Sequence, residues 1–243
     1  MPYHLMMRYA RDERLALCAL LDQAGPREPT LCQGWATVDL AAHLVLRERR
    51  PDAGVGLLGG PLAAYTRSVQ RKLAERTPFP RLVEMIRTGP PRYSLFALPG
   101  ADERANLAEY FVHHEDVRRA QPDWEPRKLD PGLTEALWHR LGMARFILRN
   151  APVGVELARD DLPEPTSPGG GAGGSAPGRT GGGPGPGTHR VRITAKARTP
   201  VVTVTGPPGE LTMWAFGRTA AARVRLDGSK AAVEALTAAR WQV

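Results

Sequence analysis

Hydrophobic residues recur every three or four positions through the first 150 residues, the spacing that gives an α-helix one apolar face. The segment 131–150 shows it most clearly, because five leucine or alanine residues follow that spacing. The pattern, interrupted by proline and glycine, predicts helices at about 8–23, 37–49, 62–75, 80–89, 102–120 and 131–150. Amphipathic helices joined by short breaks favour a helical bundle over residues 1–150.

From residue 151 onward the pattern changes to the alternation of apolar and polar residues that is typical of β-strands. Strands are expected at 153–157, 191–194, 202–204 and 224–226, with helices at 207–216 and 230–240. We therefore expect two domains, a helical bundle at 1–150 and a small α+β domain at 151–243.

A segment at about 163–188 consists almost entirely of glycine, proline, serine and alanine. Such a segment buries too little apolar surface to fold, so we expect it to be disordered. The strand expected at 153–157 precedes it and has no partner in the helical half. The segment is therefore interpreted as an insertion inside the second domain rather than as a linker between domains.

Composition limits the class of protein. Hydrophobic residues make up 42% of the 243 residues, which suffices for a core, and no apolar run approaches the length of a membrane span. The first eight residues show no signal-peptide pattern. Cys18 and Cys32 are too few for a disulfide scaffold and are interpreted as core residues, with a position near the mouth of the bundle as the alternative for Cys32. The net charge of +8 comes from scattered arginines without a nucleic-acid-binding motif. These features predict a reduced, cytoplasmic monomer or dimer without nucleic-acid or membrane partners.

The most informative stretch is 106–117, Asn-Leu-Ala-Glu-Tyr-Phe-Val-His-His-Glu-Asp-Val. It places Glu109 and His113 four residues apart, which is about 40° around a helix and one turn along it. A carboxylate and an imidazole so placed can bind one metal ion, and His43 in the helix at 37–49 is the candidate third ligand. Spacing alone leaves the alternative open: a surface pair of Glu109 with His113, and a core position for His43.

Three neighbours of this set have open roles. Asp116 lies about 20° from the direction of Glu109 around the helix, so it can be a ligand or orient His113, or else pair with an arginine on a solvated face. Asn106 lies on the same side, one turn before Glu109. His114 points about 140° away from Glu109, so these two side chains cannot share one ion.

Three motifs, Pro-Thr-Leu-Cys-Gln-Gly-Trp at 29–35, Val-Asp-Leu-Ala-Ala-His-Leu at 38–44 and Glu-Tyr-Phe-Val-His-His-Glu-Asp-Val-Arg-Arg at 109–119, together resemble the DinB-like metalloprotein superfamily. Within it the chain is similar to the branch of mycothiol-dependent maleylpyruvate isomerase, and more to an actinobacterial metal-binding subgroup than to the isomerase itself. The resemblance implies a four-helix bundle with a divalent metal, usually zinc, held by His43, Glu109 and His113. The stretches 202–218 and 227–228 are similar to that family's sterol-carrier-like C-terminal domain, so the resemblance covers nearly the whole chain apart from 163–188.

The function that this resemblance implies is a thiol-dependent isomerase or transferase. The metal would bind a low-molecular-weight thiol, mycothiol, and deliver a metal-bound thiolate to a small electrophilic metabolite. An acidic substrate needs a cation, and Arg218 is the expected anchor, with a surface or helix-capping arginine as the alternative. The rival classes are a metal-binding protein without catalysis and a small-ligand-binding regulatory module.

Overall fold

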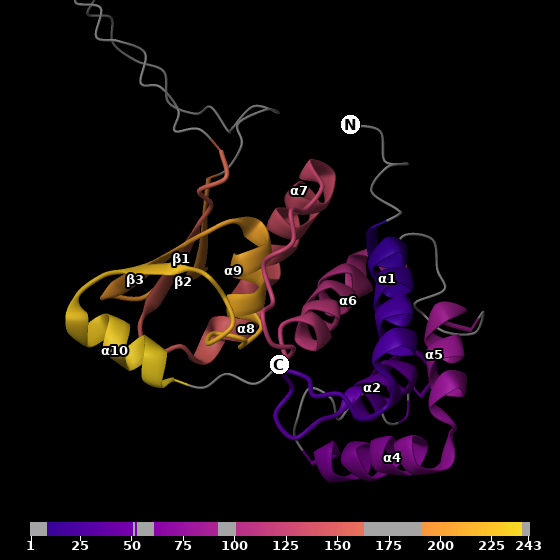
Figure 1. Cartoon of the computed structure of the whole chain (residues 1–243). Helices are drawn as coiled ribbons and strands as arrows, with labels where there is room; N and C mark the ends of the chain where they lie inside the picture. The colour runs from indigo at the N-terminus through magenta and orange to yellow at the C-terminus, as the bar shows by residue number, and fades with distance from the viewer. Residues whose placement is uncertain (1–8, 51, 53–60, 92–100, 163–190, 240–243) are drawn as a thin grey trace, which may run out of the picture.

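The computed structural model describes residues 9–50, 52, 61–91, 101–162 and 191–239, and the side chains of helix α6 from Asn106 onward. Over these residues the architecture is mixed α/β. The N-terminal half is mostly helical, and the C-terminal half carries a four-stranded sheet (Figure 1). The prediction of a helical half followed by a half with both strands and helices is confirmed at this level.

The helices of the N-terminal half lie close to the predicted ranges. They are α1 (Tyr9–Ala24), α2 (Thr37–Arg49), α4 (Ala63–Arg76), α5 (Phe79–Arg87) and α6 (Ala101–Arg118). Side chains of α1, α2, α5 and α6 share one core, which includes the fully buried Leu17, Leu40, Leu82 and Tyr110. Helices α1 and α6 lie side by side, and α4 packs against α2 (Figure 1). This core fixes α2 and α6, the two helices that carry the candidate ligands.

Helix α2 begins directly after the Gly-Trp turn. Gly34 has φ +77°, a conformation that glycine adopts without steric penalty. The Asp39 carboxylate then accepts the backbone N–H of Ala36 at 3.0 Å, which satisfies an amide that the first helical turn leaves without a partner. Leu40 and Leu44 on the following turns are buried. His43 is thereby held at the edge of the buried face of α2.

The single helix expected at 131–150 is wrong, because the segment breaks into shorter elements. They are α7 (Pro131–Arg140), a 3-10 turn (Leu141–Met143), α8 (Ala144–Ile147) and a second 3-10 turn (Leu148–Asn150). Gly142 at the first break is a poor helix former. The periodic leucines are nonetheless buried, since Leu141 and Leu148 pack in the same core as the sheet. Burial against the sheet therefore outweighs the continuity of the helix.

The sheet belongs to the C-terminal half. Its strands are β1 (Gly154–Ala158), β2 (Arg192–Lys196), β3 (Val201–Thr205) and β4 (Arg225–Asp227), in the order β2-β1-β3-β4. Strand β1 is antiparallel to β2 and parallel to β3, and β3 is antiparallel to β4. Helix α9 (Pro208–Ala215) follows β3, and α10 (Lys230–Ala238) follows β4. The segment predicted to be disordered, 163–188, lies outside the described residues.

One core joins the sheet to the helical half. Phe111 of α6, Trp138 of α7, Val155 of β1, Val202 of β3 and Trp214 of α9 belong to a single buried cluster. Helix α9 also packs against both α7 and α6. The C-terminal half is thus seated on α6, the helix that carries Glu109 and His113, while the domain boundary at 150 stays a prediction.

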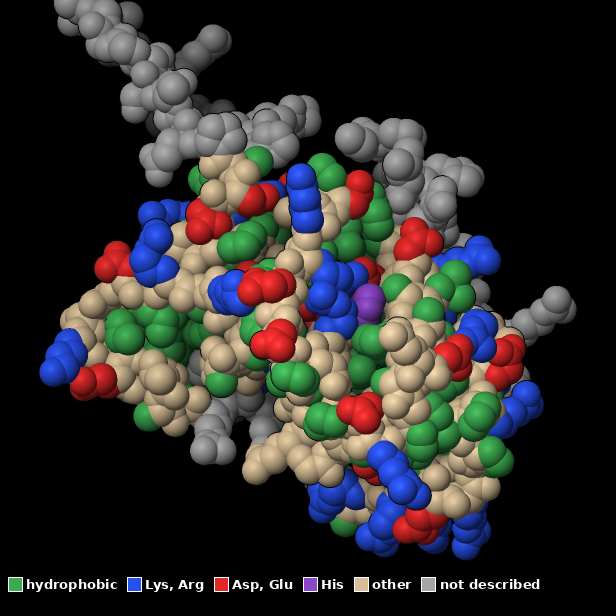
Figure 2. Space-filling view, viewed as in Figure 1, with side chains coloured by type: hydrophobic (Ala, Val, Ile, Leu, Met, Phe, Trp, Pro, Cys, Tyr) green, Lys and Arg blue, Asp and Glu red, His purple; other side chains and the backbone are tan. Residues whose placement is uncertain are grey.

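The hydrophobicity of the helices and the distribution of surface charge can be compared with the expectations about membranes and nucleic acid. None of the described helices combines the length and the hydrophobicity that crossing a membrane requires. On the face drawn in Figure 2, basic and acidic side chains are intermixed rather than gathered in one basic stripe.

Candidate metal centre

His43 of α2 and Glu109 and His113 of α6 converge as predicted. One ligand atom from each of the three lies within 4.8 Å of the other two. The His113 Nε2 atom is 3.6 Å from Glu109 Oε2, and the His43 and His113 rings are 5.1 Å apart between centroids. The alternative of a surface pair does not hold, because only 8% of the His113 side chain and 24% of the Glu109 side chain are exposed.

His43 offers a neutral imidazole. Burial, and then the nearby charge of His113, lower the pKa of His43 to about 3, so its ring carries no proton charge at neutral pH. Its Nδ1 atom is buried without a hydrogen-bond partner among the described residues. Buried polar atoms in proteins nearly always have a partner, so a nitrogen in this state is suited to a metal ion.

Glu109 offers a carboxylate. Burial raises its pKa, but the hydrogen bond with His113 and the charge of Arg47 outweigh burial and lower the pKa to about 2. The Arg47 Nε atom is 3.7 Å from Glu109 Oε2. Glu109 is therefore ionised at neutral pH, the state in which a carboxylate binds a metal.

His113 is the group on which the contacts of the site centre. Burial lowers its pKa, but hydrogen bonds to Asp116, Cys32 and Glu109 raise the pKa well above the usual value. Without a metal the ring is therefore protonated, and a metal ion would take the place of a proton.

Asp116 lies on the other side of the His113 ring. It is fully buried, so the alternative of a solvated face is wrong. Its Oδ2 atom is 2.9 Å from His113 Nδ1, whereas Glu109 faces Nε2. A second set of donors, Cys32, His113 and Asp116, also lies within 4.8 Å. Geometry alone thus leaves Asp116 both of its predicted roles, ligand or partner of His113.

Arg218 lies beside the site, but its guanidinium is engaged by the protein. Its Nε and Nη2 atoms donate to the two oxygens of Asp116 at 2.9 and 2.7 Å, and Nη2 also donates to Cys32 Sγ at 3.3 Å. Its Nη1 atom donates to the Phe216 carbonyl. An incoming acid would have to compete with Asp116 for this cation.

Asn106 bonds two side chains of α2. Its side chain bonds Arg47, and its amide is 3.4 Å from Glu48. Arg47 in turn faces Glu109, so this bond links Asn106 to a neighbour of a candidate ligand, and a role of Asn106 in supporting the ligands stays a prediction.

The sequence interpretation missed the contact of Arg47 with Glu109 and the contact of Cys32 with Asp116. The signal for Arg47 was its position four residues after His43, which puts both on one face of α2. Cys32 is partly exposed rather than a buried core residue, and its Sγ atom is 3.2 Å from Asp116 Oδ2. No pattern in the sequence links Cys32 to a residue so far along the chain.

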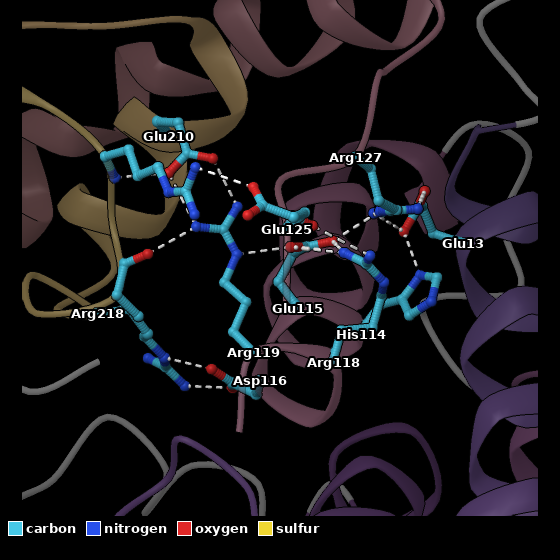
Figure 3. A network of polar contacts seen from close by, with 12 residues as sticks. Glu13, His114, Glu115, Asp116, Arg118, Arg119, Glu125, Arg127, Glu210 and Arg218 are labelled. Carbon is cyan, nitrogen blue, oxygen red and sulfur yellow. Dashed lines mark hydrogen bonds and ion pairs between the residues drawn. The ribbon is translucent and has the colours of Figure 1, made fainter. Parts of the chain in front are cut away.

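His114 points away from the site, as its rotation on the helix predicts. Its Nδ1 atom is 2.8 Å from Glu13 Oε2 of α1. Arg127 donates to both oxygens of Glu13 at 2.9 Å and to Glu115 at 2.6 Å (Figure 3). His114 therefore belongs to a polar network between α1, α6 and the segment after α6.

A groove of about 650 Å³ lies elsewhere on the described surface. It runs between the segment after α6, α7 and the start of α9, and Arg127, Leu129, Arg159 and Glu210 are among its lining residues. None of His43, Glu109 and His113 lines it.

Comparison of the chain with protein-family models, with curated proteins and with solved structures gave no match. The interpretation of the site therefore rests on the geometry given above.

Proposed function

We propose that the protein is a divalent-metal enzyme of the DinB-like type that uses a low-molecular-weight thiol, such as mycothiol, to isomerise or conjugate small electrophilic metabolites. The observation that carries this proposal is the convergence of His43, Glu109 and His113 from two helices. Three protein ligands leave a coordination position for another molecule, which is typical of catalytic rather than structural zinc sites.

The donor set suits the metal. Two imidazoles and one carboxylate are a common set for catalytic zinc, and the chain supplies one of these imidazoles neutral and the carboxylate ionised. The buried Nδ1 atom of His43, which lacks a partner among the described residues, would gain one if it bound the ion. A bound divalent metal would supply Lewis acidity, which lowers the pKa of a coordinated thiol.

The side chains around the ligands have their own tasks in this proposal. Arg47 keeps Glu109 ionised, and Asp116 accepts the Nδ1 proton of His113. The Trp35 ring, 5.2 Å from the His43 ring between centroids, covers one side of that ligand with apolar surface. Arg218 could anchor an acidic substrate only in competition with Asp116, which its guanidinium already bonds.

A second candidate is a small-ligand-binding module without catalysis. The observation in its favour is the groove of about 650 Å³, a size suited to a small molecule, which lies away from the candidate ligands. On this alternative the metal would be structural or absent.

Turnover assays separate the two candidates. Zinc-loaded protein is incubated with mycothiol and a panel of cis-alkene acids and other electrophiles, beside His43→Ala and a matched control, His139→Ala. His139 is an exposed histidine of α7 and lies outside the site. We expect turnover that requires both thiol and metal, that is lost in His43→Ala and that persists in His139→Ala. No turnover with any substrate, while a ligand binds in the groove, would favour the second candidate. Turnover that survives in His43→Ala would contradict catalysis at this metal site.

A further inference from the structure

The buried carboxylate of Asp116 joins the two halves of the molecule at the candidate metal centre. It accepts the Nδ1–H of His113 at 2.9 Å on one side and the Arg218 guanidinium, through two hydrogen bonds, on the other. Asp116 is fully buried, and 13% of the Arg218 side chain is exposed. Such a two-pronged arginine–carboxylate contact fixes orientation more tightly than a single hydrogen bond does.

The contact with Asp116 decides which nitrogen of His113 faces the candidate ligands. A histidine whose Nδ1 carries the proton presents Nε2 as its metal-binding nitrogen. Nε2 is the nitrogen that lies 3.6 Å from Glu109. The position of the Asp116 carboxylate therefore sets the orientation of the His113 ring toward the other candidate ligands.

Arg218 is aimed at Asp116 by the end of helix α9. Gly217 has φ +84°, its N–H bonds the Trp214 carbonyl, and the N–H of Arg218 bonds the Met213 carbonyl. This pair of bonds is the Schellman motif, which ends a helix in a fixed geometry and here places Arg218 immediately after it. The direction of the guanidinium is thus set by the C-terminal half of the chain.

A second ion pair joins the same two parts of the chain, with the arginine on the α6 side and the carboxylate on α9. Arg119, the first residue after α6, donates to both oxygens of Glu210 of α9 at 2.7 and 2.8 Å (Figure 3). Only 2% of the Arg119 side chain is exposed. These two bonds hold α9 against the end of α6 and involve neither His113 nor Asp116. The Arg119–Glu210 pair therefore serves as a comparison for the Arg218–Asp116 pair.

We propose that Arg218 is a positioning residue for the metal centre: through Asp116 it holds the His113 ligand, so that the metal affinity of the helical half depends on a side chain from the C-terminal half. The proposal rests on the metal site of the proposed function. Since coupling between binding and docking is reciprocal, a bound metal also strengthens the seating of α9 on α6.

The test is the zinc dissociation constant, measured by competition with a chromophoric chelator. Asp116→Asn and Arg218→Ala are expected to weaken zinc binding about 10- to 100-fold, the usual effect of losing a partner of a metal-ligating histidine. The variant that combines both changes is expected to bind zinc as tightly as the single variant with the lower affinity, because both changes act through one contact. Arg218→Lys is expected to recover part of the loss, since lysine keeps the charge but not the two-pronged geometry.

Glu210→Gln is the matched control, because it weakens the other α6–α9 pair and leaves Asp116 untouched. We expect its zinc affinity to stay close to that of the unchanged protein. Cobalt(II) substitution adds a readout that general destabilisation would not move: the visible absorption bands should shift in Asp116→Asn and Arg218→Ala and not in Glu210→Gln. Folding is checked by circular dichroism, and if Arg218→Ala does not fold, Arg218→Lys and Asp116→Asn carry the test.

Two results would overturn the proposal while leaving the metal site intact. One is equal zinc affinity of the unchanged protein, Asp116→Asn and Arg218→Ala. The other is a loss in Glu210→Gln as large as that in Arg218→Ala, which would mean that docking in general, not this contact, controls affinity. If the unchanged protein itself does not bind zinc, the proposed function fails, and this proposal fails with it.

Discussion

At the scale of single residues, His113 faces different partners through its two ring nitrogens. Nε2 faces Glu109, and Nδ1 faces Asp116, with Cys32 Sγ close to the same Asp116 oxygen. The three-donor sets therefore share His113 but differ in every other member. The guanidinium of Arg218 already occupies the side of Asp116 and Cys32, which disfavours a second cation there.

Cys32→Ala and His113→Ala tell the two donor sets apart. We expect Cys32→Ala to keep its zinc content and affinity, because His43, Glu109 and His113 remain. We expect His113→Ala to lose zinc altogether, because both sets need it. Isothermal titration of zinc into metal-free protein measures both variants. Loss of zinc in Cys32→Ala would instead assign the metal to Cys32, His113 and Asp116.

At the scale of elements, polar side chains are buried between α1, α2 and α6. Glu48 of α2 accepts from Arg14 of α1 at 2.9 Å and from the Tyr110 hydroxyl of α6 at 2.6 Å. Glu48 is 3% exposed and Arg14 is 5% exposed. Removing one partner of such a buried pair leaves the other charge in a poorly solvated place.

Glu48→Ala is therefore expected to lower the free energy of unfolding by about 3–5 kcal/mol. Glu84→Ala is the control, because Glu84 pairs with Arg87 on an exposed part of α5 and should matter by about 1 kcal/mol or less. Urea unfolding followed by circular dichroism measures both. A loss at Glu48 no larger than that at Glu84 would show that the buried pair contributes little.

The sequence predicted local elements better than contacts between them. The range 37–49 coincides with α2, because a glycine turn precedes it and a proline follows. The pairing of Glu109 with His113 follows from helix geometry alone. The break near Gly142 depends on packing against the sheet, which the periodicity of the segment does not contain. The Arg218–Asp116 contact joins residues 102 positions apart, so no local pattern contains it.

At the scale of the whole molecule, a network of charges joins α1, α6 and the segment that follows α6. Arg127 bonds Glu13 and Glu115, and Glu13 also bonds His114. Burial raises the pKa of Glu13, but the hydrogen bonds from His114 and Arg127 outweigh it and lower the pKa below its usual value. Part of the stability of the fold is therefore tied to the ionised form of this carboxyl.

A carboxyl with a lowered pKa in the folded state contributes its full stabilisation above its unfolded pKa of about 4.3, and loses it as the pH falls through the folded value. We expect the free energy of unfolding to decrease as the pH is lowered past about 4.5, and to decrease less steeply in Glu13→Gln. Glu234→Gln, an exposed change in α10, is the control and should follow the unchanged protein. Identical slopes for all three proteins would contradict a role for Glu13.

The most direct test of the central claim is the metal content of the protein, measured by mass spectrometry after purification without chelator and without a metal-affinity tag. The account predicts close to one divalent metal ion per chain, and none in a variant that combines His43→Ala with His113→Ala. A protein that folds and holds no metal, or a double variant that retains it, would contradict the assignment of His43, Glu109 and His113 as a metal centre.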